Sequence, residues 1–170
     1  MTTAADLLPV EHIDGSGLRT TFGCFPTGVT VLCALGESGP DGMAVSAFTP
    51  ASLEPPLASV CVQQSSATWP RIRRQAHRGV SILADGQENV CRSLAARAAD
   101  RFAGVAWVSS DTGAVFVEGA VSWLDCVVHD EVEAGDHIIA LLRIRRLRST
   151  HDAPPLVFHR SRFRSLTDQR

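Results

Sequence analysis

The sequence predicts a mainly β protein, a closed or nearly closed β-barrel of Greek-key type with a few short peripheral helices. Strand-like segments dominate the 170 residues, and only short helical segments interrupt them. The long strands alternate only partly between apolar and polar residues, as a curled sheet buried mainly on one face does. A chain of this length fits one domain with a sizeable core.

Composition narrows the class of protein further. Hydrophobic residues make up 45% and charged residues 20% of the chain, and the formal net charge is -2. These values are typical of a globular protein and favour neither nucleic acid nor a membrane as partner. No apolar stretch approaches the ~20 residues that span a bilayer. Residues 1–15 lack the features of a secretory signal. We therefore expect a flexible lead-in at 1–15, one domain at 16–165 and a C-terminal tail at 166–170.

The cysteines argue against disulfides and zinc. Their number is odd and no two form a CxxC pair. Most have apolar neighbours, where a free thiol behaves as a small hydrophobe. They are Cys24, Cys33, Cys61, Cys91 and Cys126. We expect buried free thiols and a reducing, cytoplasmic location.

The domain is expected to open with a helix and a strand. Residues 16–25, "SGLRTTFGCF", begin at a cap-like Ser16, carry apolar residues at helical spacing and stop at Pro26. The β-branched residues of 28–35 predict a strand. Glycine, proline and aspartate predict a turn over 36–42.

The middle of the chain alternates strands with one helix. Residues 42–56, "GMAVSAFTPASLEPP", begin as a returning strand, and 57–63 predict a buried strand. Hydroxyl residues at the start of 65–77 and Pro70 near its first turn predict a helix. A further strand is expected at 79–84.

The last third contains the longest strands. Apolar residues at helical spacing predict a helix over 87–102. Two long strands, 119–133 and 136–149, are expected to meet at Gly135. A final strand is expected over 155–163.

The first candidate site is the run at 42–56. Its small residues let a flat ligand approach the backbone, whose N–H and C=O groups can bond the edge of a heterocycle. Ser46 adds a donor. A tight barrel corner needs small residues equally, so the run alone fits both interpretations.

The second candidate is the segment 64–68, where two serines and a threonine precede the helix at 65–77. Free N–H groups at a helix start, together with hydroxyls, can hold a phosphate without a lysine. Plain N-capping by Ser66 or Thr68 is the alternative.

The third candidate is "GDH" at 135–137. Asp136 is placed to bond nearby backbone, and His137 begins the next strand. With His129 across the same hairpin it could bind a metal, but no third ligand is apparent.

Arginines cluster at two places and could meet dinucleotide phosphates, although a solvated face is the simpler interpretation. With few aromatics nearby, nucleic-acid binding is not favoured. No GxGxxG after a strand and no P-loop motif occurs, so neither of these nucleotide sites is indicated. The serines and cysteines have no adjacent base in the sequence and no GxSxG elbow occurs, so the residues indicate no covalent catalysis. The arginines are Arg71, Arg73, Arg74 and Arg78, then Arg143, Arg145, Arg146 and Arg148.

Taken together, several motifs resemble the flavin reductase domain, the NAD(P)H:flavin oxidoreductase type that supplies reduced flavin to two-component monooxygenases. The resemblance runs over about residues 18–163. Its motifs are "FPTGVTV" (25–31), "GMAVSAF" (42–48), "SLEPPL" (52–57), "SSATW" (65–69), "DRFAGVAW" (100–107), "GAVSWLDC" (119–126), "GDHII" (135–139) and "PLVFHR" (155–160). Ala44 and Ala47 stand where the family often has hydroxyl residues.

The resemblance implies a split β-barrel of the FMN-binding type, a homodimer, and a flavin near the subunit interface. It also implies hydride transfer governed by orientation, with no catalytic residue and no metal. The implied flavin-binding residues are Met43, Ala44, Val45, Ser46 and Ala47 along the isoalloxazine, Cys61, Val62 and Gln63 on the next strand, Ser66, Ala67 and Thr68 at the phosphate, Ser81 near the ribityl chain, and Arg101 and Phe102 near the flavin edge. His137 is implied to lie by the nicotinamide.

The expected function is therefore reduction of free FMN or FAD by NADH or NADPH, with diffusible reduced flavin passed to a separate monooxygenase. A flavin carrier or sensor on the same barrel, without turnover, is the alternative from another class. A different split-barrel oxidoreductase, acting on a small organic substrate, is a third.

Overall fold

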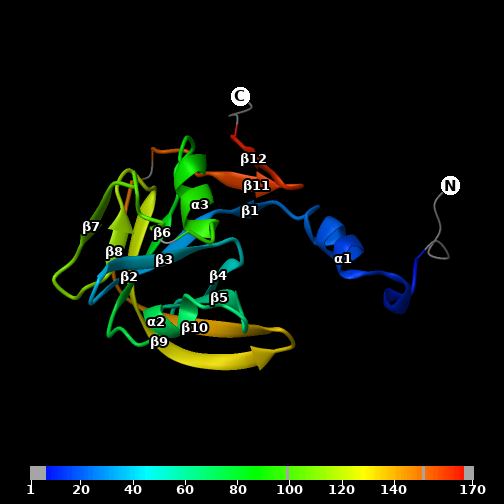
Figure 1. Ribbon diagram of the computed structural model, residues 1–170, viewed down its shortest axis with the longest axis horizontal. Helices are drawn as coiled ribbons and strands as arrows, with labels where there is room; N and C mark the ends of the chain where they lie inside the picture. Colours follow the sequence, from blue (N-terminus) through cyan, green and yellow to red (C-terminus); the bar gives the residue numbers. More distant parts are fainter. Residues whose placement is uncertain (1–6, 99, 151, 167–170) are drawn as a thin grey trace.

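The computed structural model describes residues 7–98, 100–150 and 152–166 and shows a mainly β fold, as predicted (Figure 1). The expected lead-in and C-terminal tail lie partly outside these residues. The helices are η2 (a 3-10 turn, Val10–His12), α1 (Gly15–Phe22), α2 (Trp69–Ile72) and α3 (Glu88–Ala95). The strands are β1 (Thr27–Gly28), β2 (Thr30–Gly36), β3 (Gly39–Val45), β4 (Phe48–Ser52), β5 (Leu57–Gln63), β6 (Arg78–Ile82), β7 (Trp107–Ser109), β8 (Val115–Val117), β9 (Ser122–Ala134), β10 (His137–Ser149), β11 (Val157–His159) and β12 (Arg162–Arg164).

The principal sheet of the described residues is antiparallel and has the strand order β3-β2-β6-β9-β10-β5-β4. Its two edge strands, β3 and β4, do not pair with each other within the described chain. They are nevertheless consecutive, because only Ser46 and Ala47 separate them. The sheet must therefore curl until its edges meet at this corner, although no hydrogen-bond ladder closes it there.

Strand β2 is buried on both faces and separates two hydrophobic clusters. Successive side chains of a strand point to opposite faces. Leu32 and Ala34 accordingly pack inside the curled sheet with Val60, whereas Val31 and Cys33 pack on its outer side. The outer cluster is covered by α3 and by the β7–β8 hairpin, whose strands were not predicted from the sequence.

The helices are shorter than predicted. Helix α1 begins one residue earlier than expected, and Asp14 rather than Ser16 caps it by accepting a hydrogen bond from the Gly17 N–H at 2.8 Å. The helix expected over 65–77 is the single turn α2. The helix expected over 87–102 is α3, which stops where Ala96 is extended. Residue patterns typical of a helix extend beyond each observed helix, but the core holds only the shorter segments in helical form.

Two turns also differ from the expectation. The turn predicted over 36–42 is confined to the two residues between β2 and β3. Pro40 can lie within β3 because this is an edge strand, where a missing N–H breaks no inner ladder. The single strand expected over 155–163 is the hairpin β11–β12, with Arg160 and Ser161 at positive φ in its turn.

The N-terminal segment extends away from the body of the molecule (Figure 1). Helix α1 has no buried residue. Phe22 and Phe25 are 70% and 75% exposed, and Leu7, Leu8 and Val10 are also exposed. In the described parts of the chain, no helix is long and apolar enough to cross a membrane. All five cysteines are free thiols. Cys33 and Cys126 are buried as expected, but Cys61 and Cys91 are only half-buried and Cys24, in the exposed N-terminal segment, is exposed.

Candidate functional site

A cavity of about 870 Å³, here called the ledge cavity, lies against the corner between β3 and β4. The end of β5, the segment before α2, the end of α3 and the start of β10 complete its walls. Its lining residues are Met43, Ala44, Val45, Ser46, Ala47, Cys61, Val62, Gln63, Ser65, Ser66, Ala67, Thr68, Arg71, Leu94, Ala95, Arg97, Ala98, Arg101 and His137. The curl of the sheet thus brings together segments that lie far apart in the sequence.

The corner at 43–47 is at once a tight bend and a cavity wall. The Thr30 hydroxyl donates to the Val45 carbonyl at 2.7 Å, and the Ala47 carbonyl accepts from the Cys61 N–H at 3.3 Å. The backbone N–H groups of Ser46 and Ala47 have no partner among the described residues. The small residues therefore form both a tight corner and a possible ligand ledge, because the bend leaves two backbone N–H donors beside the cavity.

The segment before α2 provides further donors. The Ser66 hydroxyl accepts from the Trp69 N–H at 3.1 Å, so Ser66 is the capping residue. Thr68 is buried, and its hydroxyl oxygen accepts from Arg101 at 2.6 Å. The N–H groups of Ala67 and Thr68 have no partner in the described part of the chain. The Ser66 hydroxyl donates only a long contact to Met43 Sδ, at 4.0 Å. An anion placed here could accept from these N–H groups and could take the Ser66 hydroxyl proton from the sulfur.

Three guanidinium groups surround this end of the cavity. Arg101 is held by the Thr68 hydroxyl and by the Gly42 carbonyl, at 2.6 and 3.0 Å. Arg71 pairs with Asp41 at 2.5 Å, and this hydrogen bond raises the pKa of Arg71. Arg97 follows α3 and lines the same wall. The end of the cavity near α2 is therefore cationic.

His137 lines the ledge cavity from the start of β10. It is paired in register with Gln63 of β5 and with Ala134 of β9. Its Nδ1 is 2.7 Å from an Asp136 carboxylate oxygen, and this hydrogen bond lowers the pKa of Asp136. The Gln64 side chain donates to the Gly135 carbonyl at 3.1 Å and so ties the turn to β5. The imidazole is thus oriented by its neighbour at the cavity wall.

Nearly all of the residues named from the resemblance line this one cavity, but Ser81 and Phe102 do not. Ser81 is fully buried in β6, where its hydroxyl accepts from the Val117 N–H at 3.0 Å. Phe102 packs in the outer cluster, with its ring 6.3 Å from that of Trp107. The structure therefore places both side chains away from the ledge cavity.

Sequence reasoning left other lining residues out of the flavin set. In the sequence, Ser65 stands out only as part of the hydroxyl run at 64–68, and Arg71 only as part of the first arginine cluster. The end of α3 and the segment after it form a wall that the sequence does not predict, with Leu94, Ala95, Arg97 and Ala98. The only local signal for this wall is the alanine-rich run at 95–98, and such a run does not by itself predict a cavity.

The expectation of a solvated arginine face is wrong for Arg78. This residue is 2% exposed and donates to the carbonyls of Gln75 and Ala76. It faces inward because β6 pairs Arg78 with the buried Cys126 of β9. Burial lowers the pKa of Arg78 and raises that of Cys126 to about 12. Other arginines form ion pairs, including Arg73 with Glu131 at 2.8 Å.

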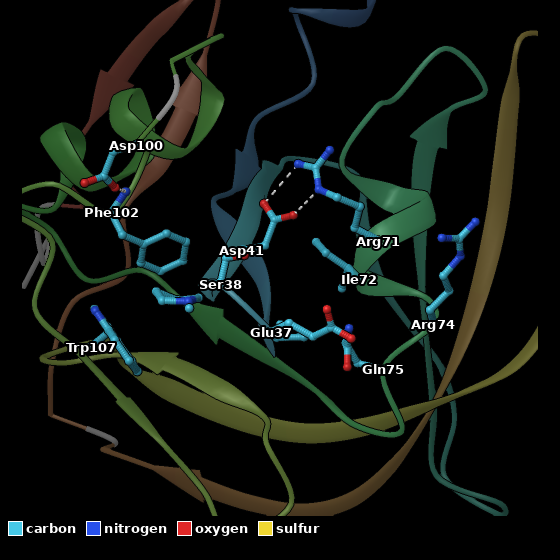
Figure 2. Close-up of a pocket in the computed structure, with 14 residues that line it drawn as sticks. Glu37, Ser38, Asp41, Arg71, Ile72, Arg74, Gln75, Asp100, Phe102 and Trp107 are labelled. Atoms are coloured by element: carbon cyan, nitrogen blue, oxygen red, sulfur yellow. Dashed lines mark hydrogen bonds and ion pairs between the residues drawn. The ribbon is translucent and has the colours of Figure 1, made fainter.

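A second cavity, of about 950 Å³, is here called the side cavity (Figure 2). Arg71 lines both cavities. The other residues of the side cavity are Ala34, Gly36, Glu37, Ser38, Gly39, Pro40, Asp41, Ile72, Arg74, Gln75, Asp100, Phe102 and Trp107. Within the described residues, no group of three or more His, Cys, Asp or Glu side chains could hold a metal ion.

Comparison with known proteins gives one consistent family. The model of the flavin reductase like domain matches residues 22–167. A flavin reductase of Pseudomonas putida is 38% identical over 161 residues, covering 94% of this chain and 95% of the relative. The reductase subunit HsaB of a flavin-dependent monooxygenase of Rhodococcus jostii is 33% identical over 161 residues, covering 95% of this chain and 83% of the relative.

A solved structure agrees with these relatives. It is the NADH:FAD oxidoreductase SgcE6 of Streptomyces globisporus in complex with NAD and FAD fragments. Its TM-score is 0.88 at 36% identity, over 95% of this chain and 97% of the other.

Proposed function

Because the chain belongs to the flavin reductase like domain family, we propose that it is an NAD(P)H:flavin oxidoreductase that reduces free FMN or FAD and releases the reduced flavin to a separate monooxygenase. The observation that carries this proposal is the ledge cavity. It unites a small-residue ledge, a cationic end with free N–H groups, and His137.

The donor set of the ledge cavity fits a flavin mononucleotide. The ledge offers the N–H groups of Ser46 and Ala47 to the polar edge of a flat ring system. The cationic end offers Ser66, the N–H groups of Ala67 and Thr68, and its three arginines to a phosphate. These two sets of donors suit the ring and the phosphate of a flavin.

Bound flavin supplies the chemistry by accepting, at its N5, the hydride that leaves C4 of the reduced nicotinamide. The chain's own residues bind and orient the two reactants. The ledge holds the ring plane, and His137, fixed by Asp136, contacts the nicotinamide.

The test is nicotinamide oxidation by the purified protein. NADH and NADPH are each mixed with FMN, FAD or riboflavin, and the loss of the reduced-nicotinamide absorbance is followed. Turnover with at least one pair is expected. Flavin binding without any turnover would instead support the carrier or sensor alternative and overturn the reductase proposal.

Replacing His137 with alanine is expected to raise the KM for the nicotinamide about tenfold, the equivalent of about 1.4 kcal/mol, while leaving flavin affinity unchanged. The reason is that His137 lines the cavity from the start of β10, whereas the groups assigned to the flavin ring and phosphate lie at the corner 43–47 and on the segment 64–68. Steady-state kinetics and a flavin titration separate the two effects. His129→Ala, an exposed histidine on β9 outside the cavity, is the control. An equal loss of flavin affinity in His137→Ala would contradict the nicotinamide role.

We also infer a homodimer in which the N-terminal segment covers a second copy of the chain. The support is the unpartnered apolar surface of α1 and its flanks, Phe22 and Phe25 above all. The double variant Phe22→Asp, Phe25→Asp is expected to sediment as a monomer where the unmodified chain sediments as a dimer. A dimer that persists in this variant argues against this interface.

Two finer features belong to the same proposal. We infer that the curled principal sheet is a split β-barrel of the Greek-key, FMN-binding type, and the two-residue link between its edge strands supports this. We infer a cytoplasmic location from the five free thiols, which suit a reducing compartment.

A further inference from the structure

We propose that the side cavity receives the adenosine half of FAD, which makes FAD rather than FMN the preferred flavin of this chain. The inference rests on the proposed function, because it takes the ledge cavity as the site of the flavin ring and first phosphate. It adds a second binding site, with Arg71 between the two, and a substrate preference.

The two cavities share one lining residue at the phosphate end. Arg71 lines both, and β3 runs from Asp41 in the side cavity to Met43 in the ledge cavity. A phosphate bound before α2 lies beside Arg71. FMN ends at this phosphate, whereas FAD continues through a second phosphate to adenosine. The side cavity, which shares Arg71, offers space for that continuation.

Arg71 is prepared to bind a diphosphate. Its Nε and Nη2 donate to Asp41 at 2.5 and 3.2 Å, and its Nη1 donates to the Ala67 carbonyl at 2.6 Å. A guanidinium group has five N–H donors, so these bonds leave two for a ligand. The Asp41 pair holds the group in place between the cavities.

The far wall of the side cavity suits a purine. Figure 2 shows Phe102 and Trp107 on the side opposite Arg71 and Ile72. The two rings meet edge to face, with an interplanar angle of 79°. Trp107 is only half-buried, so an aromatic surface remains for a base to stack on.

The charges favour a neutral nucleoside over a second anion. Glu37, Asp41 and Asp100 bring three carboxylates to the cavity, against the two guanidinium groups of Arg71 and Arg74. Away from Arg71, the wall therefore repels phosphate. Carboxylates can accept hydrogen bonds from ribose hydroxyls and from the adenine amino group. Adenosine matches both the aromatic surface and these acceptors.

The test compares FAD with FMN by calorimetric binding and by steady-state reduction. The unmodified protein is expected to bind FAD at least about tenfold more tightly than FMN. Trp107→Ala is expected to weaken FAD binding about tenfold, because it removes the stacking surface, and to leave FMN binding within about twofold. Equal affinities for the two flavins in the unmodified protein would overturn the proposal.

A second variant covers the case in which Trp107→Ala does not fold. Ser38→Trp places a large side chain in the side cavity from an exposed turn and leaves the core intact. It is expected to weaken FAD binding about tenfold without affecting FMN. Ser109→Trp, at an exposed serine of β7 outside both cavities, is the control and should bind both flavins normally.

The outcomes separate this inference from the proposed function. A protein that reduces no flavin fails the proposed function. A protein that reduces flavins, but whose FAD and FMN affinities stay unchanged or change together in Ser38→Trp, fails only the adenosine site. If Ser38→Trp raises the KM for NADH, measured with FMN as acceptor, but leaves FAD affinity unchanged, the side cavity binds the adenosine of NADH. That result would overturn the FAD assignment.

Discussion

Replacing Asp125 with alanine should lower the free energy of unfolding by about 3 kcal/mol. Asp125 is 3% exposed and accepts hydrogen bonds from three segments that are far apart in the sequence. Its partners are His77 before β6 at 2.6 Å, Thr112 between β7 and β8 at 2.9 Å, and Arg146 of β10 at 2.7 Å. The expected loss is at the lower end for breaking a buried ion pair, because Arg146 is half exposed and water can solvate it.

The loss in Asp125→Ala should depend on pH. Burial raises the pKa of Asp125, but the bonds from His77, Arg146 and Thr112 outweigh it, so the folded pKa lies below its usual value. The unfolded chain therefore binds the proton more tightly, near pH 3.9. The stability from this carboxylate is present above that pH and is lost as the pH falls through the folded pKa.

Urea unfolding at several pH values checks the Asp125 prediction. The difference between Asp125→Ala and the unmodified protein should be largest near pH 7 and shrink below about pH 4. Asp130→Ala, an exposed aspartate of the same strand, should change stability by no more than about 0.5 kcal/mol. A difference that stays constant down to about pH 3 would show that the network does not depend on the Asp125 charge.

Replacing Ala47 with tryptophan should weaken flavin binding about 100-fold or more, which corresponds to about 2.7 kcal/mol. Ala47 is exposed at the bend between β3 and β4, and its side chain borders the ledge cavity. An indole there competes for the space of a flat ring and covers the backbone donors of the bend. Stability should change little, because no core contact is replaced.

Flavin titration by calorimetry, together with thermal unfolding, measures the effect of Ala47→Trp. Ala51→Trp introduces the same ring at an exposed position of β4 outside the cavity, and it should bind flavin normally. Normal flavin affinity in Ala47→Trp would mean that the ledge cavity is not the flavin site. Nicotinamide oxidation with FMN should fall in parallel with affinity at low flavin concentration.

Local sequence patterns were enough to place most strands. The buried strand 57–63 coincides with β5, and the long strands at 119–133 and 136–149 correspond closely to β9 and β10. Turn chemistry at Gly135 also predicted their hairpin, since Gly135 has a φ of +64°. Helix lengths were overestimated because periodicity continued into the segments after α2 and α3, where tertiary contacts select other conformations.

The candidate site was only partly predictable. The hydroxyl segment at 64–68 and the small-residue ledge carry local signals, and both line the cavity. Ser81 illustrates the limit, because β6 is buried on both faces and its pattern does not show which side chains face a ligand. The Arg71–Asp41 pair spans 30 positions of the chain and carries no local signal.

The sequence by itself determined a mainly β chain, the small-residue bend at 43–47, and a hydroxyl cap before a short helix. These features depend on residues close together in the chain, where propensity, capping and turn chemistry act. Only the tertiary structure decided that the sheet curls until its edges meet at Ser46 and Ala47. That curl brings α3, Arg101 and His137 to one cavity and places Arg71 between two. Contacts of this kind depend on packing between distant strands, which no local pattern records.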